Sequence, residues 1–175
     1  MDWKNILEDG FNRIPAFVEH VLSGLSREDI TWQPKPDSNS IGWLVWHLTR
    51  QQDAQVAALM GEDQLWTRDG WHQKFDRPAD PEDIGFGDTP EDVAAFKPPE
   101  TEVMMDYLKA AGQRTIGYFR GLSAKDLDRE LDEPQYQPLP KVGVRLISIL
   151  DDCIIHAGQA AYIRGLRQGK GWQKY

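Results

Sequence analysis

Apolar side chains recur at intervals of three and four residues along four long segments of this chain. The segments lie at about 6–23, 40–60, 101–120 and 144–168. This spacing places one apolar stripe along each α-helix, whose period is 3.6 residues. No segment of comparable length alternates as a strand would. The pattern predicts an all-α fold in which four helices bury their stripes against one another as a four-helix bundle.

Local signals predict where several helices begin and end. Ser38 or Ser40 can cap the second long helix, and Gly61 can end it. Ser26 is expected to cap a short helical turn after the first long helix. Pro15 lies inside that first helix and is expected to kink or break it.

The connection at 62–99, between the second and third long helices, is expected to be irregular, apart from a short helix at Pro90–Phe96 capped by Thr89. A connection of this length in a compact domain is usually functional or disordered. Its aromatic residues favour an ordered, lid-like segment. They are Trp66, Trp71, Phe75 and Phe86.

Length and charge limit the classes of protein to which the chain can belong. With 175 residues, the whole of 1–175 is expected to form one domain, with a flexible tail at 169–175. A net charge of −8 argues against nucleic acid as a partner. No apolar run approaches the roughly 20 residues of a membrane span, and the acidic start does not resemble a secretory signal. We therefore expect a cytoplasmic protein that acts on small molecules.

Two of the four histidines lie inside the apolar helical segments. His47 belongs to the second long helix and His156 to the fourth. Asp152 precedes His156 by four residues, so both side chains project from the same helix face. This face is predicted to turn inward, and its members are Arg145, Ile149, Asp152, His156, Gln159 and Ile163.

Two imidazoles and one carboxylate form a donor set that suits zinc, nickel or iron better than magnesium or calcium. Three protein ligands would leave a coordination position for water or substrate, as in catalytic sites. The spacing also fits a hydrogen-bonded core pair of Asp152 and His156, with His47 as an ordinary buried histidine. From spacing alone both interpretations stay open.

Three motifs together resemble the DinB/YfiT-like superfamily. They are Leu-Ser-x-x-Asp-Ile-x-Trp-x-Pro (25–34), Asn-Ser-Ile-Gly-Trp-Leu-Val-Trp-His-Leu-Thr-Arg (39–50) and His-Ala-Gly-Gln-Ala-Ala-Tyr-Ile-Arg-Gly-Leu (156–166). Within it, the chain is most similar to the actinobacterial branch that includes mycothiol-dependent enzymes. The resemblance implies an up-down-down-up bundle that holds a divalent metal through His47, position 152 and His156. Position 152 is Asp here, where the commonest family pattern has His.

The resemblance also implies an activity. It suggests a detoxifying S-transferase that uses a small thiol, mycothiol or bacillithiol, as nucleophile toward an electrophile. A metal-dependent hydrolase or isomerase, or a non-enzymatic stress-response or ligand-binding module, remains the alternative. The single cysteine, Cys153, falls on an apolar helix and is expected to be inert.

Six further residues are candidates for the site around the metal. Gln159 and His72 are candidates for catalytic roles, in orienting a ligand and in acid–base chemistry. The candidates for binding the cofactor or substrate are Trp43, Trp46, Tyr136 and Arg145. Helix bundles with exposed apolar faces often dimerise, so a homodimer is also expected.

Overall fold

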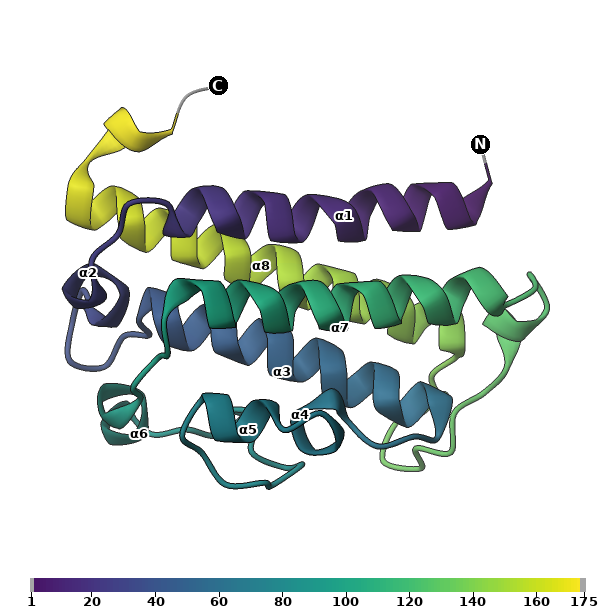
Figure 1. Ribbon diagram of the computed structural model, residues 1–175. Helices are drawn as coiled ribbons and strands as arrows, with labels where there is room; N and C mark the ends of the chain where they lie inside the picture. Colours follow the sequence, from purple (N-terminus) through teal and green to yellow (C-terminus); the bar gives the residue numbers. More distant parts are fainter. Residues whose placement is uncertain (1, 174–175) are drawn as a thin grey trace.

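The computed structural model describes residues 2–173, which form a bundle of four long helices (Figure 1). The long helices are α1 (Trp3–Leu22), α3 (Ile41–Met60), α7 (Thr101–Gly121) and α8 (Val142–Gln168). No strand occurs in the described residues, so the predicted all-α fold is confirmed. In Figure 1, α1 and α8 run in one direction while α3 and α7 run in the other. The helices α3 and α1 each pack against both α7 and α8.

The predicted caps account for the helix ends. Ser40 caps α3, and its side-chain oxygen accepts the Trp43 backbone N–H at 3.2 Å. Gly61 ends α3 in the left-handed conformation. Ser26 caps the short helix α2 (Arg27–Thr31) through a capping box. The prediction that the helix could break at Pro15 is wrong, because α1 continues past this proline for another seven residues to Leu22.

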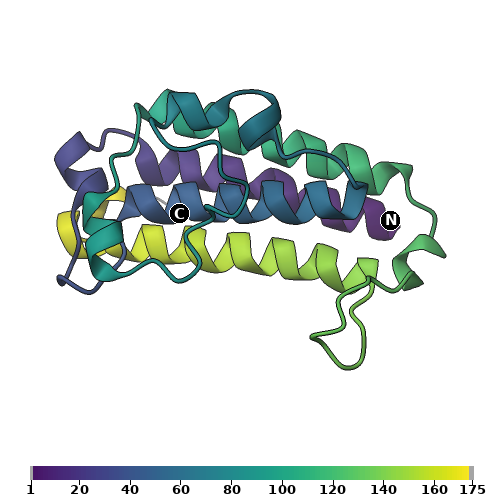
Figure 2. The same ribbon diagram turned by 90° about the horizontal axis from the view of Figure 1, so that it is seen from below.

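The connection between α3 and α7 contains more helix than the sequence predicted. Besides the expected α6 (Pro90–Ala95), it forms α4 (Leu65–Arg68) and α5 (Trp71–Lys74), which no periodic pattern announces because each spans only one turn. Seen from below, the connection passes across α3 from the side of α7 to the side of α8 (Figure 2). It therefore contacts both of the grooves that α3 forms with its neighbours.

Two buried charged residues on α3 hold this connection in place. The Asp53 carboxylate accepts the backbone N–H groups of Leu65 and Trp66, both at 2.9 Å. Arg50 has no exposed surface and donates from Nε to the Asp83 carbonyl at 3.0 Å. Backbone groups that would otherwise be orphaned beneath the connection are thereby satisfied.

The connection is also anchored by aromatic packing, with one exception. Trp66, Trp71 and Phe75 are buried around Tyr107 of α7, with ring centroids 5.0–5.8 Å from the tyrosine ring. Phe86 instead leaves 86% of its surface exposed. That exposed ring lies in the part of the connection that reaches α8.

The segments on either side of α8 are short and partly ordered. A 3-10 turn (η1, Asp126–Asp128) and an isolated bridge between Glu130 and Lys141 close the loop before the helix. After it, a second turn (η2, Lys170–Trp172) places Trp172 over the Arg164 guanidinium, 4.6 Å from the ring centroid. The expected flexible tail thus contains one docked aromatic, and its last two positions lie outside the described residues.

Candidate metal centre

The groove between α3 and α8 brings the three predicted ligands together. His47 projects from α3, while Asp152 and His156 project from one face of α8. One potential ligand atom from each residue lies within 4.8 Å of those of the other two. The His156 Nε2 atom is 3.4 Å from the Asp152 Oδ1 atom. The rings of His47 and His156 meet edge to face, with centroids 4.7 Å apart. The packing of α3 against α8 therefore forms a cluster with the donor set of a transition-metal site.

The cluster is closed on its inner side and open outward. His47 is 6% exposed, whereas the side chains of Asp152 and His156 are 27% and 18% exposed. A catalytic metal centre requires such an opening for water or substrate.

A loop of the connection fixes the ring of His47. The Ile84 carbonyl lies 2.5 Å from Nδ1, and a carbonyl can only accept, so Nδ1 carries the proton. The Trp43 ring stacks on the imidazole at 4.7 Å with an interplanar angle of 11°. Trp43 in turn donates from Nε1 to the Asp88 carboxylate at 2.8 Å. The Nε2 atom of His47 is therefore left as the metal-binding nitrogen, in the manner of metal-ligating histidines.

Gly85 allows this loop to approach so closely. Its φ of +81° favours glycine, and a methyl group there would lie 2.8 Å from ring atoms of Trp43 and Trp46. The same methyl group would lie 3.0 Å from Nδ1 of His47. The three rings therefore leave no room for a side chain at position 85.

His156 is oriented by a similar bond from its own helix. Its Nδ1 atom lies 2.8 Å from the Gln159 side-chain oxygen, an acceptor, so this nitrogen also carries the proton. The Nε2 atom then faces Asp152. Both imidazoles therefore use Nδ1 for a supporting hydrogen bond and present Nε2 for a metal.

Asp152 has an unsatisfied oxygen. Its Oδ2 atom is buried and has no hydrogen-bond partner within residues 2–173. A buried carboxylate oxygen without a partner is costly, and a bound cation would supply that partner. The residues present therefore fit a divalent metal, and the orphaned oxygen distinguishes the cluster from a satisfied core pair.

The environment shifts the pKa values of both histidines. Burial lowers the pKa of His47, which favours the neutral imidazole needed for ligation. The hydrogen bond that the His156 imidazole donates to the Asp152 carboxylate is the main reason that the pKa of His156 is raised. Burial also raises the pKa of the Cys153 thiol, so this cysteine is no nucleophile.

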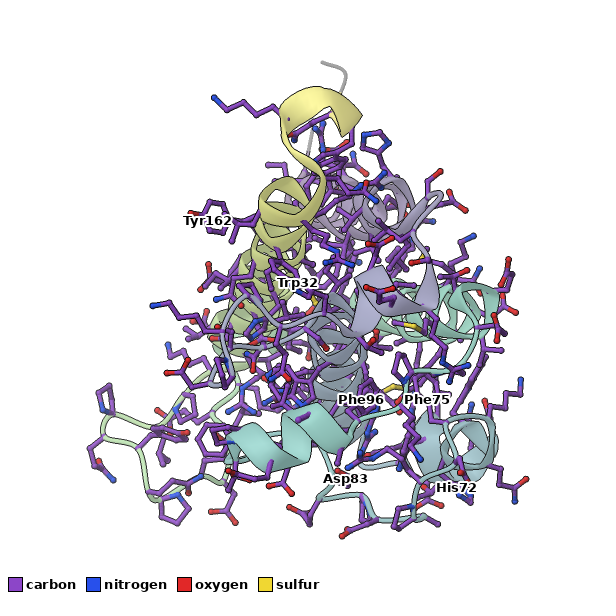
Figure 3. The ribbon with its side chains drawn as sticks, turned by 90° about the vertical axis from the view of Figure 1, so that its left-hand side faces the viewer. Trp32, His72, Phe75, Asp83, Phe96 and Tyr162 are labelled. Atoms are coloured by element: carbon purple, nitrogen blue, oxygen red, sulfur yellow. The ribbon has the colours of Figure 1, made fainter. Side chains whose placement is uncertain are left out.

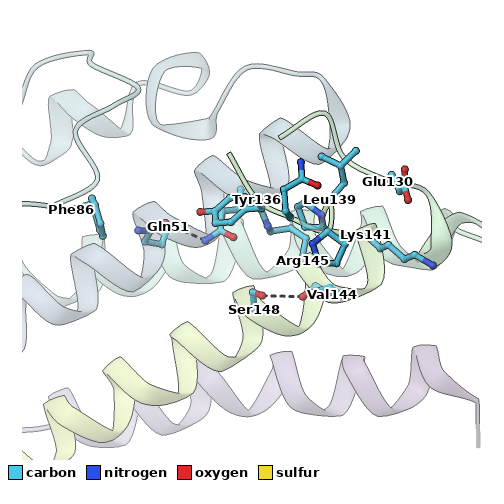
Figure 4. Close-up of a pocket in the computed structure, with 13 residues that line it drawn as sticks. Gln51, Phe86, Glu130, Tyr136, Leu139, Lys141, Val144, Arg145 and Ser148 are labelled. Atoms are coloured by element: carbon cyan, nitrogen blue, oxygen red, sulfur yellow. Dashed lines mark hydrogen bonds between the residues drawn. The ribbon is translucent and has the colours of Figure 1, made fainter. Parts of the chain in front are cut away.

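Two cavities flank the cluster along the groove. The larger, of about 850 Å³, begins one helical turn from the ligands, at Gln51 and Ser148 (Figure 4). The smaller, of about 580 Å³, lies on the other side and includes Leu44 and Gln159. A substrate in the larger cavity would therefore lie beside the proposed metal.

The larger cavity contains two of the predicted binding residues. Tyr136 of the loop before α8 and Arg145 of α8 both line it (Figure 4). The Arg145 guanidinium forms an ion pair with Glu133, so it is not a free anion site. Phe86 and Gln51 line the same cavity. Phe86 was expected in the lid-like connection, but neither residue was predicted to bind a ligand, because neither stands in a recognisable motif.

The structure places three of the other candidates away from the cavity. Trp43 and Trp46 are 5% and 1% exposed, so they pack against His47 or in the core rather than contact a ligand. His72 lies on α5, edge-on to Trp66 and on the α7 side of α3 (Figures 1 and 3). The prediction that His72 supplies acid–base chemistry does not fit that position, because α3 separates it from α8.

Comparison with known proteins agrees with this architecture. The profile of the DinB superfamily matches residues 11–160, which is most of the chain. The chain belongs to the DinB superfamily.

A solved relative has the same fold. The crystal structure of a conserved protein from Enterococcus faecalis is 32% identical, with a TM-score of 0.88. The alignment covers 97% of this chain and 99% of the other. A comparison with curated proteins found no match. The superfamily is known for metal binding, which agrees with the cluster of His47, Asp152 and His156.

Proposed function

We propose that this DinB-superfamily protein is a metal-dependent enzyme that transfers a small thiol to an electrophile. His47, Asp152 and His156 would hold one divalent metal, with zinc the first choice and nickel or iron the alternatives. The observation that carries the proposal is the juxtaposition of this donor set, with its orphaned carboxylate oxygen, and a cavity of about 850 Å³.

A bound metal would lower the pKa of a thiol or water so that it reacts as an anion near neutral pH. The protein's own residues supply the positioning. The Ile84 carbonyl and Gln159 hold the two imidazoles, and Trp43 prevents the His47 ring from turning. Because Cys153 is buried, the protein's own thiol is not available, and the proposal takes the nucleophile from a small external thiol.

The cavity suits a thiol that bears hydroxyl groups. Its wall combines side-chain amides of Gln51 and Gln55 and the Ser148 hydroxyl with the aromatic rings of Phe86 and Tyr136. Amides and hydroxyls can hydrogen-bond a sugar, and exposed aromatic rings can cover its apolar face. Mycothiol and bacillithiol both combine a sugar with a cysteine, so we propose either as the co-substrate. A cytoplasmic location follows from that choice, since such thiols are held in the cytoplasm.

Metal content tests the first part of the proposal. Protein purified without chelator should contain one equivalent of divalent metal by elemental analysis, and His47→Ala and His156→Ala should lose it. His72→Ala serves as the matched histidine control and should keep its metal. Unchanged metal content in both ligand variants would show that the site is misassigned.

Two substitutions at Asp152 test whether the metal needs a carboxylate at this position or only a third ligand. Asp152→His keeps three donors and should still bind metal, while Asp152→Ala should lose at least about tenfold in affinity. If Asp152→Ala binds as well as the natural protein, Asp152 is not a ligand.

Turnover tests the thiol. Metal-loaded protein should consume an electrophile only when mycothiol or bacillithiol is added, with loss of the free thiol measured alongside. Equal turnover without thiol would favour a hydrolase or isomerase that uses the same metal centre.

A further inference from the structure

The smaller cavity of the groove lies on the opposite side of the metal centre from the larger one. Leu44 precedes His47 by three residues on α3, and Gln159 follows His156 by three residues on α8. Since an α-helix rises about 1.5 Å per residue, both lie about one turn from the proposed metal. The larger cavity begins one turn away in the other direction, at Ser148. The metal would therefore lie between two cavities, each close enough to hold one reactant.

The two cavities differ in charge. The larger one includes the charged side chains Glu130, Lys141 and Arg145. The described residues that line the smaller one include no charged side chain, although 27% of the chain is charged. A neutral, apolar molecule therefore suits the smaller cavity better than a thiol that bears hydroxyl groups. Its apolar side chains are those of Pro34, Leu44, Ile155, Ile163 and Leu166.

The metal centre fixes one polar group of the smaller cavity. The side-chain oxygen of Gln159 accepts the Nδ1 proton of His156 at 2.8 Å, which leaves the amide nitrogen to donate elsewhere. That nitrogen has no hydrogen-bond partner within residues 2–173. Because oxygen and nitrogen belong to one planar amide, the bond to His156 also fixes the direction of the donor. A neutral ligand with an oxygen acceptor would meet this donor one helical turn from the metal.

The outer wall of the smaller cavity is open to solvent. Ile155 and Leu166 are 47% and 51% exposed, and Tyr162 is 69% exposed and points away from the bundle (Figure 3). A ligand can therefore enter without a movement of the long helices. Contiguous apolar surface of this kind marks a binding site in many soluble proteins, because a ligand removes it from water.

A membrane span is a poorer explanation of these apolar residues. The helix α8 is the one described helix long and apolar enough to cross a membrane by length and composition, and 33% of that window is buried. Yet Asp151, Asp152 and His156 lie near the middle of α8, where burial in lipid would be costly.

We propose that the smaller cavity binds the electrophile, and that this electrophile is an apolar α,β-unsaturated carbonyl compound such as a long-chain 2-alkenal. Its hydrocarbon chain would lie along α8 toward Leu166, and its carbonyl oxygen would accept a hydrogen bond from Nε2 of Gln159. The inference rests on the proposed thiol transfer, since it assigns the second reactant of that reaction to the same groove.

Conjugate addition to such a compound needs neither a leaving group nor a redox partner. The thiol loses its proton to water, and its sulfur forms a bond to the β-carbon. The electrons of the C=C double bond move toward the carbonyl, which becomes a negatively charged enolate oxygen. A proton from water then adds to the α-carbon, so the product is the sum of thiol and alkenal. The N–H group of Gln159 would stabilise the enolate oxygen as a donor of an oxyanion hole does.

Binding of an unreactive analogue tests the cavity apart from catalysis. The ketone 2-nonanone has a long chain and a carbonyl oxygen but no C=C double bond, so it cannot add a thiol in this way. Calorimetric titration of the full chain should give a dissociation constant at least about tenfold lower for 2-nonanone than for 2-butanone, because the longer chain buries more apolar surface.

Gly158→Phe tests the position of the ligand. Gly158 lines the smaller cavity, and nothing lies within 4 Å of the place that a Cβ atom would take, so a ring can be added there. The substitution should weaken the binding of 2-nonanone at least about tenfold by occupying its space. Gly117→Phe is the matched control, since Gly117 is an exposed glycine of α7 that also has nothing within 4 Å. It should leave the binding unchanged.

Gln159→Glu distinguishes the donor from the support of His156. An ionised glutamate still accepts the Nδ1 proton but cannot donate. Metal content should therefore be unchanged, while kcat for 2-nonenal with the thiol should fall about 100-fold. Gln159→Met removes both functions and should weaken metal binding as well.

The outcomes distinguish this inference from the proposed function. If 2-nonanone binds but no electrophile is consumed, the thiol transfer is wrong and the cavity is still a site for apolar carbonyl compounds. If thiol-dependent turnover of 2-nonenal proceeds and Gly158→Phe changes neither KM nor the binding of 2-nonanone, the electrophile binds elsewhere and the inference is wrong. Full kcat in Gln159→Glu would overturn the role of the amide donor.

Discussion

The buried charged residues on the two sides of α3 differ in how far their hydrogen bonds are satisfied. On the side of α7, Arg50 and Asp53 are buried, and each oxygen of the Asp53 carboxylate accepts a backbone N–H group. On the side of α8, the cluster of His47, Asp152 and His156 leaves a carboxylate oxygen that has no partner among the described residues. Both sets lie on the same bundle within two helical turns of one another.

The α7 side is a hydrogen-bonded network centred on Asp53, in which only Nε of Arg114 has no partner within residues 2–173. The Tyr107 hydroxyl donates to Asp53 at 2.8 Å and accepts from Arg50 at 3.1 Å. Arg114 adds a further bond to Asp53 at 3.2 Å, and burial raises the pKa of Tyr107 well above its usual value. These bonds hold the connection onto α3. Both oxygens of Asp53 accept two hydrogen bonds each, so neither is free to bind a ligand.

The α8 side uses its hydrogen bonds differently. Both histidines are oriented by bonds at Nδ1, and the atoms that converge on the centre of the cluster remain free. The comparison teaches that polar residues inside a bundle indicate a ligand site when their supporting bonds are complete and their converging atoms are not. Four experiments test this distinction.

The largest difference should appear between two aspartates. Asp53→Ala leaves Arg50 without a carboxylate, leaves Arg114 with Glu62 alone and removes the acceptor of the first N–H groups of α4. We therefore expect a loss of about 3–5 kcal/mol in the free energy of unfolding. Asp152→Ala removes an oxygen that already lacks a partner, and the metal-free protein should stay within about 1 kcal/mol of the natural one. Urea unfolding of both variants measures the contrast, and equal losses would contradict it.

Metal removal should destabilise only through the α8 side. At a free metal concentration about 100 times the dissociation constant, binding adds about 2.7 kcal/mol to the free energy of unfolding. A chelator should therefore lower the Tm of the natural protein but not that of His156→Ala. A chelator effect of the same size in that variant would place the metal elsewhere.

Alanine substitutions at Gly85 and Gly87 distinguish the effect of the loop's contact with His47 from the effect of backbone strain. Both have positive φ, but a methyl group meets the His47 and Trp43 rings at Gly85 and nothing within 4 Å at Gly87. Each alanine substitution should cost about 1–3 kcal/mol through strain alone. Only Gly85→Ala should also weaken metal binding, by about 10–100-fold, because it displaces a support of a ligand. Calorimetric titration with zinc would show this, and equal affinities would contradict the role of the loop.

The smallest effect should come from Trp43→Phe. The substitution keeps an aromatic ring against His47 but removes the bond from Nε1 to Asp88. We expect a loss of about 0.5–1.5 kcal/mol in stability, typical of one hydrogen bond. Metal affinity should change little, because the Ile84 carbonyl still holds the ring. A large loss of affinity would show that Asp88 itself positions the histidine.

Much of the site was predictable because helix geometry is local. The spacing of Asp152 and His156 places them on one face whatever the rest of the chain does. The caps at Ser26 and Ser40 are likewise read from neighbouring residues. Gln159, which supports His156, could be proposed from the sequence because it lies one turn away on the same helix. The support of His47 was not predictable, since the Ile84 carbonyl is a backbone atom that any residue would supply at that position.

The buried network around Asp53 was not predicted from the sequence either. Arg50 and Asp53 look like ordinary surface charges on a helix, because nothing nearby in sequence shows that α4 and Tyr107 cover them. Trp43 was expected to line a cavity and instead stacks on a ligand, since its type indicates burial but not its neighbour.

The four long helices, the caps at Ser26 and Ser40, and the pairing of one carboxylate with one histidine follow from the sequence alone. These depend on residues within a few turns of each other. Only the tertiary structure decided that His47 joins that pair, that a loop 37 residues away sets its tautomer, and that one oxygen of Asp152 lacks a partner. The physical reason is that a metal site is defined by unsatisfied atoms, and satisfaction depends on contacts that the packing of distant segments creates.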